Sequence, residues 1–205
     1  MNADTTLIED SQLDALVEAT VRGDLTDPFS LLGMHRAGGR AGDGAGGGPG
    51  GGPGGGPGGG AVVVRTFLPG ARSVQVVDAA TGQAVADLAQ VHPDGFFAGE
   101  VPGRTERFGY RLRAMEAGGE REFADAYGFP PVLGELDVHL LAEGTHLRSY
   151  ERLGAHATEM QGVSGTAFAV WAPNARRVSV VGNFCNWDGR RLPMRKRHEC
   201  GVWEL

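Results

Sequence analysis

Residues 166–205 read TAFAVWAPNARRVSVVGNFCNWDGRRLPMRKRHECGVWEL, and their pattern indicates the fold class. The run 166–171 is rich in β-branched and aromatic residues, and the turn sequence APNA at 172–175 closes it. Residues 177–181 then alternate between polar and apolar, and 201–205 begin another such run. Short strands at close spacing, with no helical period between them, predict an antiparallel β-sandwich.

A second region with the same pattern lies earlier in the chain. Strand patterns separated by turn residues occupy 61–67, 73–78, 85–88, 96–101 and 110–115. One part of this region, VRTFLPGARSVQVVD at 64–78, aligns without gaps on FAVWAPNARRVSVVG at 168–182. The recurring residues are Pro69, Ala71, Arg72, Val74, Val76 and Val77, which become Pro173, Ala175, Arg176, Val178, Val180 and Val181. The chain is therefore predicted to contain two copies of one sandwich, the second of them unfinished.

Three further segments have different patterns. Apolar residues at helical spacing predict a short amphipathic helix at 12–22. Residues 38–60 are nearly all Gly, with Pro at a four-residue interval, and predict a disordered surface insertion because they have almost no side chains to bury. Helical spacing returns at 133–143, so 126–160 is predicted to be a packed, partly helical connector.

Together these patterns predict a mainly β fold. It consists of two tandem immunoglobulin-like antiparallel β-sandwiches, with a short N-terminal helix and a partly helical connector. The predicted domains are the helix and first sandwich at 1–125, the connector at 126–160, and the start of a truncated second sandwich at 161–205.

Composition and charge exclude several classes of partner. The net charge of -6 and the pI of about 5.5 disfavour nucleic acid and anionic membranes, which attract clustered Lys and Arg. No stretch approaches the roughly 20 apolar residues of a membrane span, and the first residues lack the pattern of a secretory signal. The two cysteines, Cys185 and Cys200, are then expected to be reduced thiols, and the protein is expected to be cytoplasmic.

The sequence predicts no catalytic residue, no metal site and no cofactor. The six His residues are scattered, and no pair of them has metal-ligand spacing with a third ligand close by. Cys185 lies beside aromatic and amide residues without an activating base, so we expect an inert thiol. His35 is expected to have a structural role, because no second ligand or base lies near it in the sequence.

Three motifs resemble a known family. The run WAPNARRVSVVGNF, followed by NWDGR and GVWEL, resembles the starch- and glycogen-binding β-sandwich that precedes the catalytic barrel of glycogen branching enzymes. The segment 129–156, FPPVLGELDVHLLAEGTHLRSYERLGAH, resembles the branching-enzyme pattern FxPxLxxxDxHLxxEGxHxxxYxxLGAH and is the most specific of the three. The segment DPFSLLGMH at 27–35 is similar to the opening of the first N-terminal module of long branching enzymes.

The resemblance implies a function in glycogen biosynthesis. It implies the N-terminal portion of a 1,4-α-glucan branching enzyme, which transfers an α-1,4-linked oligoglucan to a 6-hydroxyl by retaining double displacement. The catalytic carboxylates of that family belong to a barrel, which would be a partner within the same polypeptide. These 205 residues are then expected to bind and position α-1,4-glucan or glycogen, and to be inactive alone. The alternative is a stand-alone α-glucan-binding or regulatory module without catalytic activity.

One turn has the side chains that a sugar site needs. Aromatic faces pack on the apolar side of a pyranose ring, while amides and carboxylates reach its hydroxyl groups. The turn supplies these groups as Asn183, Asn186, Trp187 and Asp188. The resemblance to glycogen-sensing relatives implies that Trp187 stacks on glucose, whereas the structural alternative is that Trp187 packs on the neighbouring barrel.

The turn also departs from the family pattern. Asn183 replaces an Asp and Cys185 replaces an Asn, which removes one charge and one amide. The other two tryptophans, Trp171 and Trp203, lie within predicted strands and are expected in the core.

Overall fold

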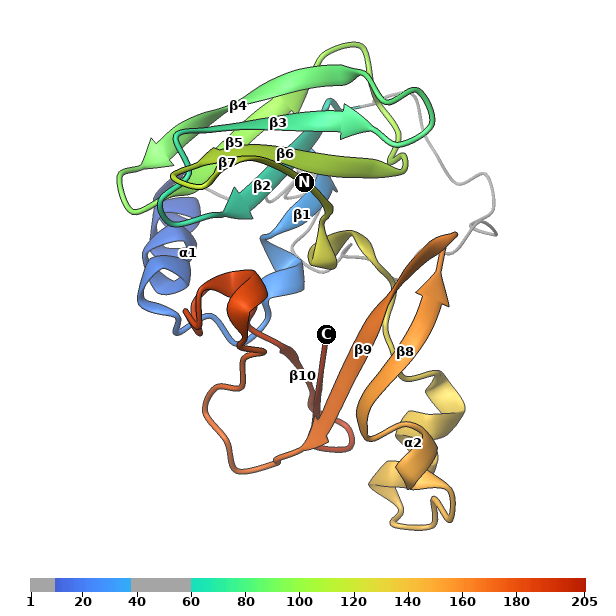
Figure 1. Ribbon diagram of the computed structural model, residues 1–205. Coiled ribbons are helices and arrows are strands. Elements are labelled where there is room, and N and C mark those ends of the chain that lie inside the picture. Colours follow the sequence, from blue (N-terminus) through green and yellow to red (C-terminus); the bar gives the residue numbers. More distant parts are fainter. Residues whose placement is uncertain (1–9, 38–59) are drawn as a thin grey trace, which may run out of the picture.

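The computed structural model describes residues 10–37 and 60–205 (Figure 1). Within these residues the protein is mainly β, with one seven-stranded and one four-stranded antiparallel sheet and two α-helices. The predicted fold class is thus confirmed. The glycine-rich insertion predicted at 38–60 lies outside the described residues, apart from Gly60.

The first copy forms the larger sheet. Its strands are β1 (Gly33–Arg36), β2 (Val62–Phe67), β3 (Ser73–Asp78), β4 (Ala84–His92), β5 (Phe96–Val101), β6 (Tyr110–Glu116) and β7 (Gly119–Ala124). They lie in the order β1-β2-β5-β4-β3-β6-β7. All five strands predicted from the sequence are present here, and β1 and β7 were not predicted.

This sheet folds over into a sandwich at β4. Residues 84–88 of β4 pair with β3, and residues 89–92 pair with β5, with a register shift in each pairing. In a flat sheet β2 and β6 would be about 19 Å apart, since four strand spacings of about 4.8 Å separate them. Val64 of β2 and Leu112 of β6 nevertheless belong to one buried cluster. The two halves of the sheet therefore face each other across that core.

Helix α1 (Asp10–Arg22) covers the outer face of this sandwich. It begins two residues before its predicted start and places Val17 and Val21 in a second buried cluster. Phe67 of β2 and Phe96 of β5 belong to the same cluster. The amphipathic period of the helix thus matches the face that it buries.

The second copy forms the smaller sheet, in the lower part of Figure 1. Its elements are α2 (Glu135–Ala142), β8 (Gly154–Met160), β9 (Val163–Trp171), β10 (Arg195–Arg197) and β11 (Val202–Glu204). Four short 3-10 helices occur among the described residues of both copies: η1 (Pro28–Ser30), η2 (Ala126–Gly128), η3 (Ser149–Glu151) and η4 (Asn183–Cys185). The strand order is β10-β11-β9-β8. Strand β8 was not predicted. It lies within the segment expected to be a connector and pairs with β9 along its whole length.

The strand predicted at 177–181 is wrong. In this segment the structure has an isolated bridge between Ser179 and Pro193, and Val180 N donates to Leu192 O at 3.0 Å. In the first copy, β3 is paired on both edges, by β4 and by β6. The described residues pair with 177–181 on one edge only, and Pro193 has no backbone N–H to extend the ladder.

The strand pairings confirm the internal repeat. The alignment of 64–78 with 168–182 carries Phe67 of β2 onto Trp171 of β9. The neighbouring strands β5 and β11 then pair in the same register, with Thr66 opposite Phe97 and Phe67 opposite Phe96 in the first copy, and Val170 opposite Trp203 and Trp171 opposite Val202 in the second. The order β1-β2-β5-β4 thus recurs as β8-β9-β11-β10.

The repeat also extends backward to the helices, which the sequence analysis did not detect. At one constant offset, α1, η1 and β1 align on α2, η3 and β8. The matched positions share specific features. Val17 and Val138 are both buried, and the matched glycines, Gly23 with Gly144 and Gly33 with Gly154, all have positive φ. His35 and His156 make the same hydrogen bond to the backbone. His35 Nε2 donates to Leu32 O at 2.9 Å, and His156 Nε2 donates to Leu153 O at 3.0 Å. Both histidines therefore have the structural role predicted for His35.

Candidate functional site

The four predicted site residues lie in one turn of the second copy. Helix η4 begins this turn, and Asn186 and Trp187 follow it with φ angles of 55° and 57°. Two successive non-glycine residues in the left-handed region are uncommon and cost conformational free energy. They reverse the chain so that the Trp187 side chain stands out from the surface, 67% exposed.

Asn183 fixes the orientation of this ring. Its Oδ1 accepts a hydrogen bond of 2.8 Å from Trp187 Nε1. Among the described residues, no partner is recorded for Asn183 Nδ2 or for the exposed side chain of Asn186. The turn therefore presents an oriented aromatic face with two amide groups free to meet hydroxyl groups.

Asp188 is engaged within the protein. Its two carboxylate oxygens accept hydrogen bonds from the Arg190 guanidinium at 2.8–3.2 Å, and Oδ1 also accepts from Arg190 N at 2.9 Å. The hydrogen bond from the Arg190 side chain holds the pKa of Asp188 below its ordinary value. Asp188 therefore stabilises the end of the turn through its hydrogen bonds with Arg190.

Cys185 points into the protein. It is buried, and its Sγ lies 3.3 Å from both Gly182 N and Gly182 O. Cys185 and Cys200 are both free thiols. Cys185 therefore lies in the interior of the turn and does not contribute to its outward surface.

The two remaining tryptophans differ from each other. Trp203 is 1% exposed, and its Nε1 donates to Ala172 O at 3.0 Å, so its predicted core position is confirmed. The prediction for Trp171 is wrong, because this side chain is 61% exposed. Its counterpart Phe67 is covered by the cluster around α1, whereas the cluster beneath α2 does not include Trp171.

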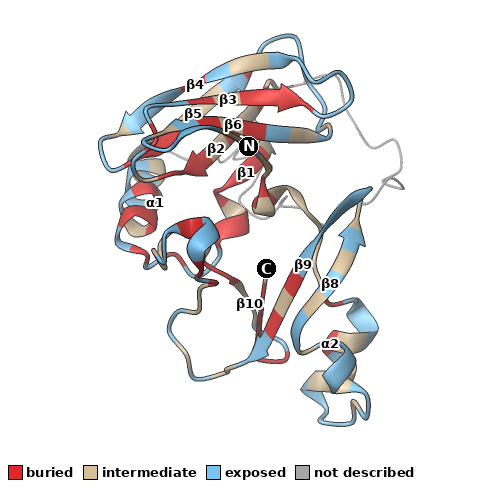
Figure 2. Cartoon of the chain, in the orientation of Figure 1, coloured by how far each residue is buried: buried red, intermediate tan, exposed pale blue. Residues whose placement is uncertain are grey.

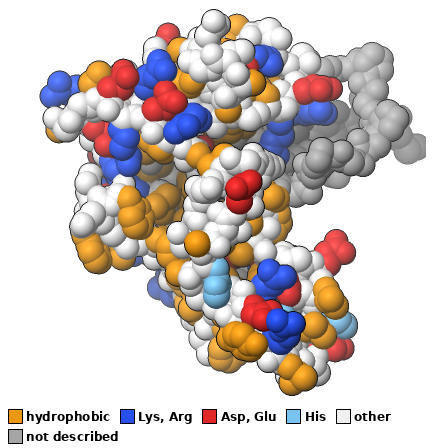
Figure 3. Space-filling view, turned by 45° about the vertical axis from the view of Figure 1, so that its right-hand side comes forward, with side chains coloured by type: hydrophobic (Ala, Val, Ile, Leu, Met, Phe, Trp, Pro, Cys, Tyr) orange, Lys and Arg blue, Asp and Glu red, His pale blue; other side chains and the backbone are white. Residues whose placement is uncertain are grey.

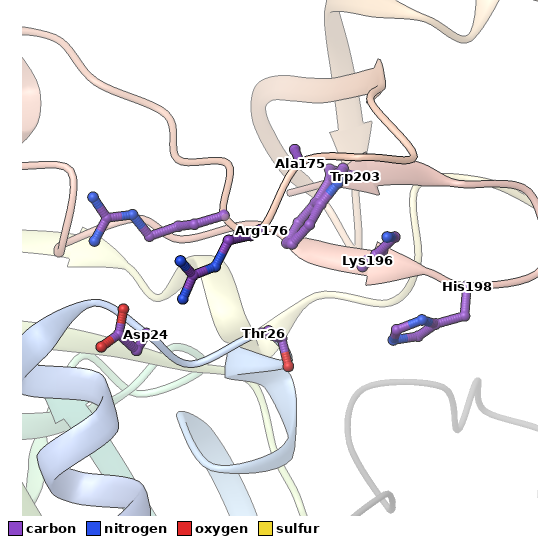
Figure 4. Close-up of a pocket in the computed structure, with 8 residues that line it drawn as sticks. Asp24, Thr26, Ala175, Arg176, Lys196, His198 and Trp203 are labelled. Carbon is purple, nitrogen blue, oxygen red and sulfur yellow. The ribbon is translucent and has the colours of Figure 1, made fainter.

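A hollow of about 510 Å³ lies between the loop after α1 and the hairpin of β10 and β11 (Figure 4). Asp24 and Thr26 line one side, and cationic side chains line the other (Figure 4). Two of the cations are already bonded to backbone oxygens: Arg177 Nη1 donates to Gly23 O at 3.0 Å, and Lys196 Nζ donates to Pro173 O at 2.6 Å. The Arg177 bond joins the two copies across this hollow, whereas the Lys196 bond lies within the second copy.

A second cavity of about 290 Å³ is mainly apolar. Phe168, Phe184 and Leu192 are among its lining residues, and Trp187 lines neither cavity. The Trp187 ring is therefore exposed at the surface and is enclosed by neither cavity.

Residues 10–37 and 60–205 lack two features that would indicate other functions. They contain no group of three or more His, Cys, Asp and Glu side chains arranged to hold a metal ion. No helix among them has the length and apolar character needed to span a membrane.

Comparison with known proteins identifies the family of each part. Residues 12–127 match the family described as alpha-1,4-glucan branching enzyme GlgB, N-terminal domain. Residues 152–205 match carbohydrate-binding module 48, the isoamylase N-terminal domain.

Three relatives are named 1,4-alpha-glucan branching enzyme GlgB. The protein of Rubrobacter xylanophilus is 52% identical over 92% of this chain, that of Paramagnetospirillum magneticum 48% over 97%, and that of Cereibacter sphaeroides 51% over 92%. In each case the chain spans 23% of the relative's length. A solved structure, the pullulanase from Anoxybacillus sp. LM18-11, aligns with 70% of the chain at 18% identity and a TM-score of 0.20, which is too low to carry an argument. The chain therefore belongs to the family of the GlgB 1,4-α-glucan branching enzyme N-terminal domain, and its residues 152–205 are similar to carbohydrate-binding module 48.

Proposed function

We propose that this chain is the glucan-binding and glucan-positioning part of a 1,4-α-glucan branching enzyme. The observation that carries the proposal is the Trp187 ring, which is exposed and held in one orientation by Asn183. An exposed indole face packs on the apolar face of a glucose unit, and the amides of Asn183 and Asn186 lie where they can bind hydroxyl groups. Asp188 takes part by holding the turn through Arg190.

A native gel containing glycogen tests this proposal. The 205-residue chain is expected to be retarded, and Trp187→Ala is expected to bind at least about tenfold more weakly, which corresponds to about 1.4 kcal/mol. Trp171→Ala is the matched control, because Trp171 is exposed to a similar extent on the same module. Equal retardation of Trp187→Ala and the parent would refute the sugar-stacking role.

We further propose that the transfer of oligoglucan takes place in the part of the relatives that this chain does not span. The relatives that are named branching enzymes are much longer than the chain, which supports this division. The 205 residues alone are then expected to introduce no α-1,6 branches into amylose. Branch formation by the isolated chain, followed by the iodine stain, would contradict this expectation.

We also propose how the chain is divided into units and where the protein is located. Residues 126–160 are proposed to act as one unit with 161–205, because α2 and β8 repeat α1 and β1. A cytoplasmic location is proposed because the free thiols Cys185 and Cys200 suit a reducing compartment.

A further inference from the structure

The first copy contacts the beginning of the Trp187 turn. Arg121 of β7 donates from Nη1 to Phe184 O at 3.1 Å. The Arg121 guanidinium lies 4.4 Å from the ring centroid of Phe123, and its Nη2 is 3.6 Å from a carboxylate oxygen of Glu116. These contacts hold the cation in place from two sides, so the backbone at Phe184 meets a fixed donor.

The first copy also contacts the end of the turn. Arg190 Nη1 donates to Val21 O at 3.4 Å, while the same guanidinium binds Asp188. Val21 lies in the last turn of α1, where backbone carbonyls lack helical partners and carry partial negative charge. The guanidinium also lies 5.7 Å from the ring centroid of Phe67. Arg190 thus connects the end of the turn to the helix and core of the first copy.

Arg191 anchors the chain immediately after the turn. Its side chain is 5% exposed and donates from Nη2 to Pro69 O at 2.6 Å and to Glu116 Oε1 at 2.9 Å. Glu116 is therefore shared by Arg191 and Arg121, which lie at the two ends of the turn. A single carboxylate of the first copy thus joins both anchors.

Between these anchors lie the residues with left-handed backbone. Asn186 and Trp187 adopt a conformation that a free loop would populate rarely. Fixing the two ends favours this conformation before any ligand arrives, and a site that is already ordered loses less entropy when it binds. The contacts from the first copy therefore restrain the turn of the second at both ends.

We infer that Arg121 and Arg190 are positioning residues for α-glucan binding, through which the first copy keeps the Trp187 turn in its binding conformation. The inference rests on the proposed function. Neither arginine touches the sugar in this account. No local sequence pattern indicates this role, since Arg121 and Arg190 are far from each other in the chain.

The test uses Arg121→Ala and Arg190→Ala, with Lys variants at both positions. Maltoheptaose is titrated into each protein by calorimetry, and the indole N–H signals of the three tryptophans are recorded by NMR without ligand. We expect both Ala variants to bind about 5- to 10-fold more weakly and to shift or broaden the Trp187 signal, with the Trp171 signal unchanged. The Lys variants should recover part of the affinity, because Lys keeps the positive charge but not the planar guanidinium group.

Controls separate this role from general stability. Arg113→Ala removes a cation that pairs with Glu122 inside the first copy and should leave affinity unchanged. The Trp203 signal reports whether the second copy remains folded, because Trp203 is buried in its core. Arg121 lies on the edge strand β7, so Arg121→Ala tests the inference even if Arg190→Ala unfolds. Parent-like affinity in Arg121→Ala, or weaker binding with an unchanged Trp187 signal, would overturn the inference. Parent-like affinity in Trp187→Ala would instead overturn the proposed function, and the inference with it.

Discussion

The two copies share one scaffold but differ in what they bury. Phe67 in the first copy is 2% exposed, whereas its counterpart Trp171 is 61% exposed. Phe29 is likewise buried, whereas its counterpart Tyr150 is 68% exposed. Figure 2 shows the same contrast: α1 carries buried residues along one face, and α2 and β8 are largely exposed. The same strand register therefore occurs with a buried aromatic residue in the first copy and with an exposed one in the second.

The helices of the two copies differ as well. Helix α1 has 13 residues and α2 has 8. Leu25, which packs beneath α1, is replaced in the second copy by His146, whose Nε2 donates to Asp137 Oδ1 at 3.0 Å. A polar pair thus stands where the first copy has an apolar contact. Figure 3 shows hydrophobic side chains at the surface of this lower part, where Leu136 and Leu147 are exposed.

The largest predicted effect concerns the aromatic pair. Phe67→Ala removes a buried ring and should lower the free energy of unfolding by about 3–5 kcal/mol. Trp171→Ala removes a mostly exposed ring and should cost less than about 1 kcal/mol. Urea unfolding measures both values. Equal losses would mean that the two copies bury these rings alike, which would contradict the difference in exposure.

The next prediction concerns a feature that the copies share. Gly95 and Gly201 both have positive φ, and a Cβ would lie 2.8 Å from Pro69 Cα in the first copy and 2.7 Å from Pro173 Cβ in the second. Replacing either glycine by Ala should cost about 2 kcal/mol, because left-handed strain and a close contact combine. Gly118→Ala is the control, since a Cβ there would meet nothing within 4 Å. If only one of the two glycines were sensitive, the copies would not share this turn.

A third prediction concerns the contact between Asp188 and Arg190, which lies in the Trp187 turn of the second copy. Arg190 lowers the pKa of Asp188, so the Asp188–Arg190 contact is fully present above the ordinary Asp pKa of about 3.9 and is lost as the pH falls through the lowered value. Maltoheptaose affinity should therefore be constant from about pH 7 to 5 and fall by about threefold below about pH 4. Asp188→Asn should bind more weakly than the parent at pH 7 and show less of this acid loss. Identical pH profiles for the parent and the variant would exclude the contact from binding.

The sequence predicted the fold class and most strands because local patterns determine them. Pro69 and Pro173 mark the same turn, and alternation identifies the flanking strand in the first copy. The same alternation misled at 177–181, because forming a strand requires partners that alternation does not reveal. The repeat of α1 in α2 was missed because the helices have diverged in their apolar residues.

The candidate site was predicted in part. Asn183, Asn186, Trp187 and Asp188 were predicted as a site because they are close together in a sequence of turn-forming residues, and the structure has all four in one turn. The hydrogen bonds that hold the turn join residues far apart in the chain, such as Arg190 with Val21, and no local pattern reports them. The exposure of Trp171 also depends on what covers its face, which the strand sequence does not determine.

The most direct measurement follows the three indole N–H signals while maltoheptaose is titrated into the chain. The chain has three tryptophans: Trp203 is buried in the core, Trp171 is exposed on a strand, and Trp187 is exposed on the turn. We expect a saturable shift of the Trp187 signal, with the Trp171 and Trp203 signals nearly unmoved. A saturable shift of Trp171 alone, or no shift of any indole signal, would contradict the claim that the second copy binds glucan through the turn that the first copy holds.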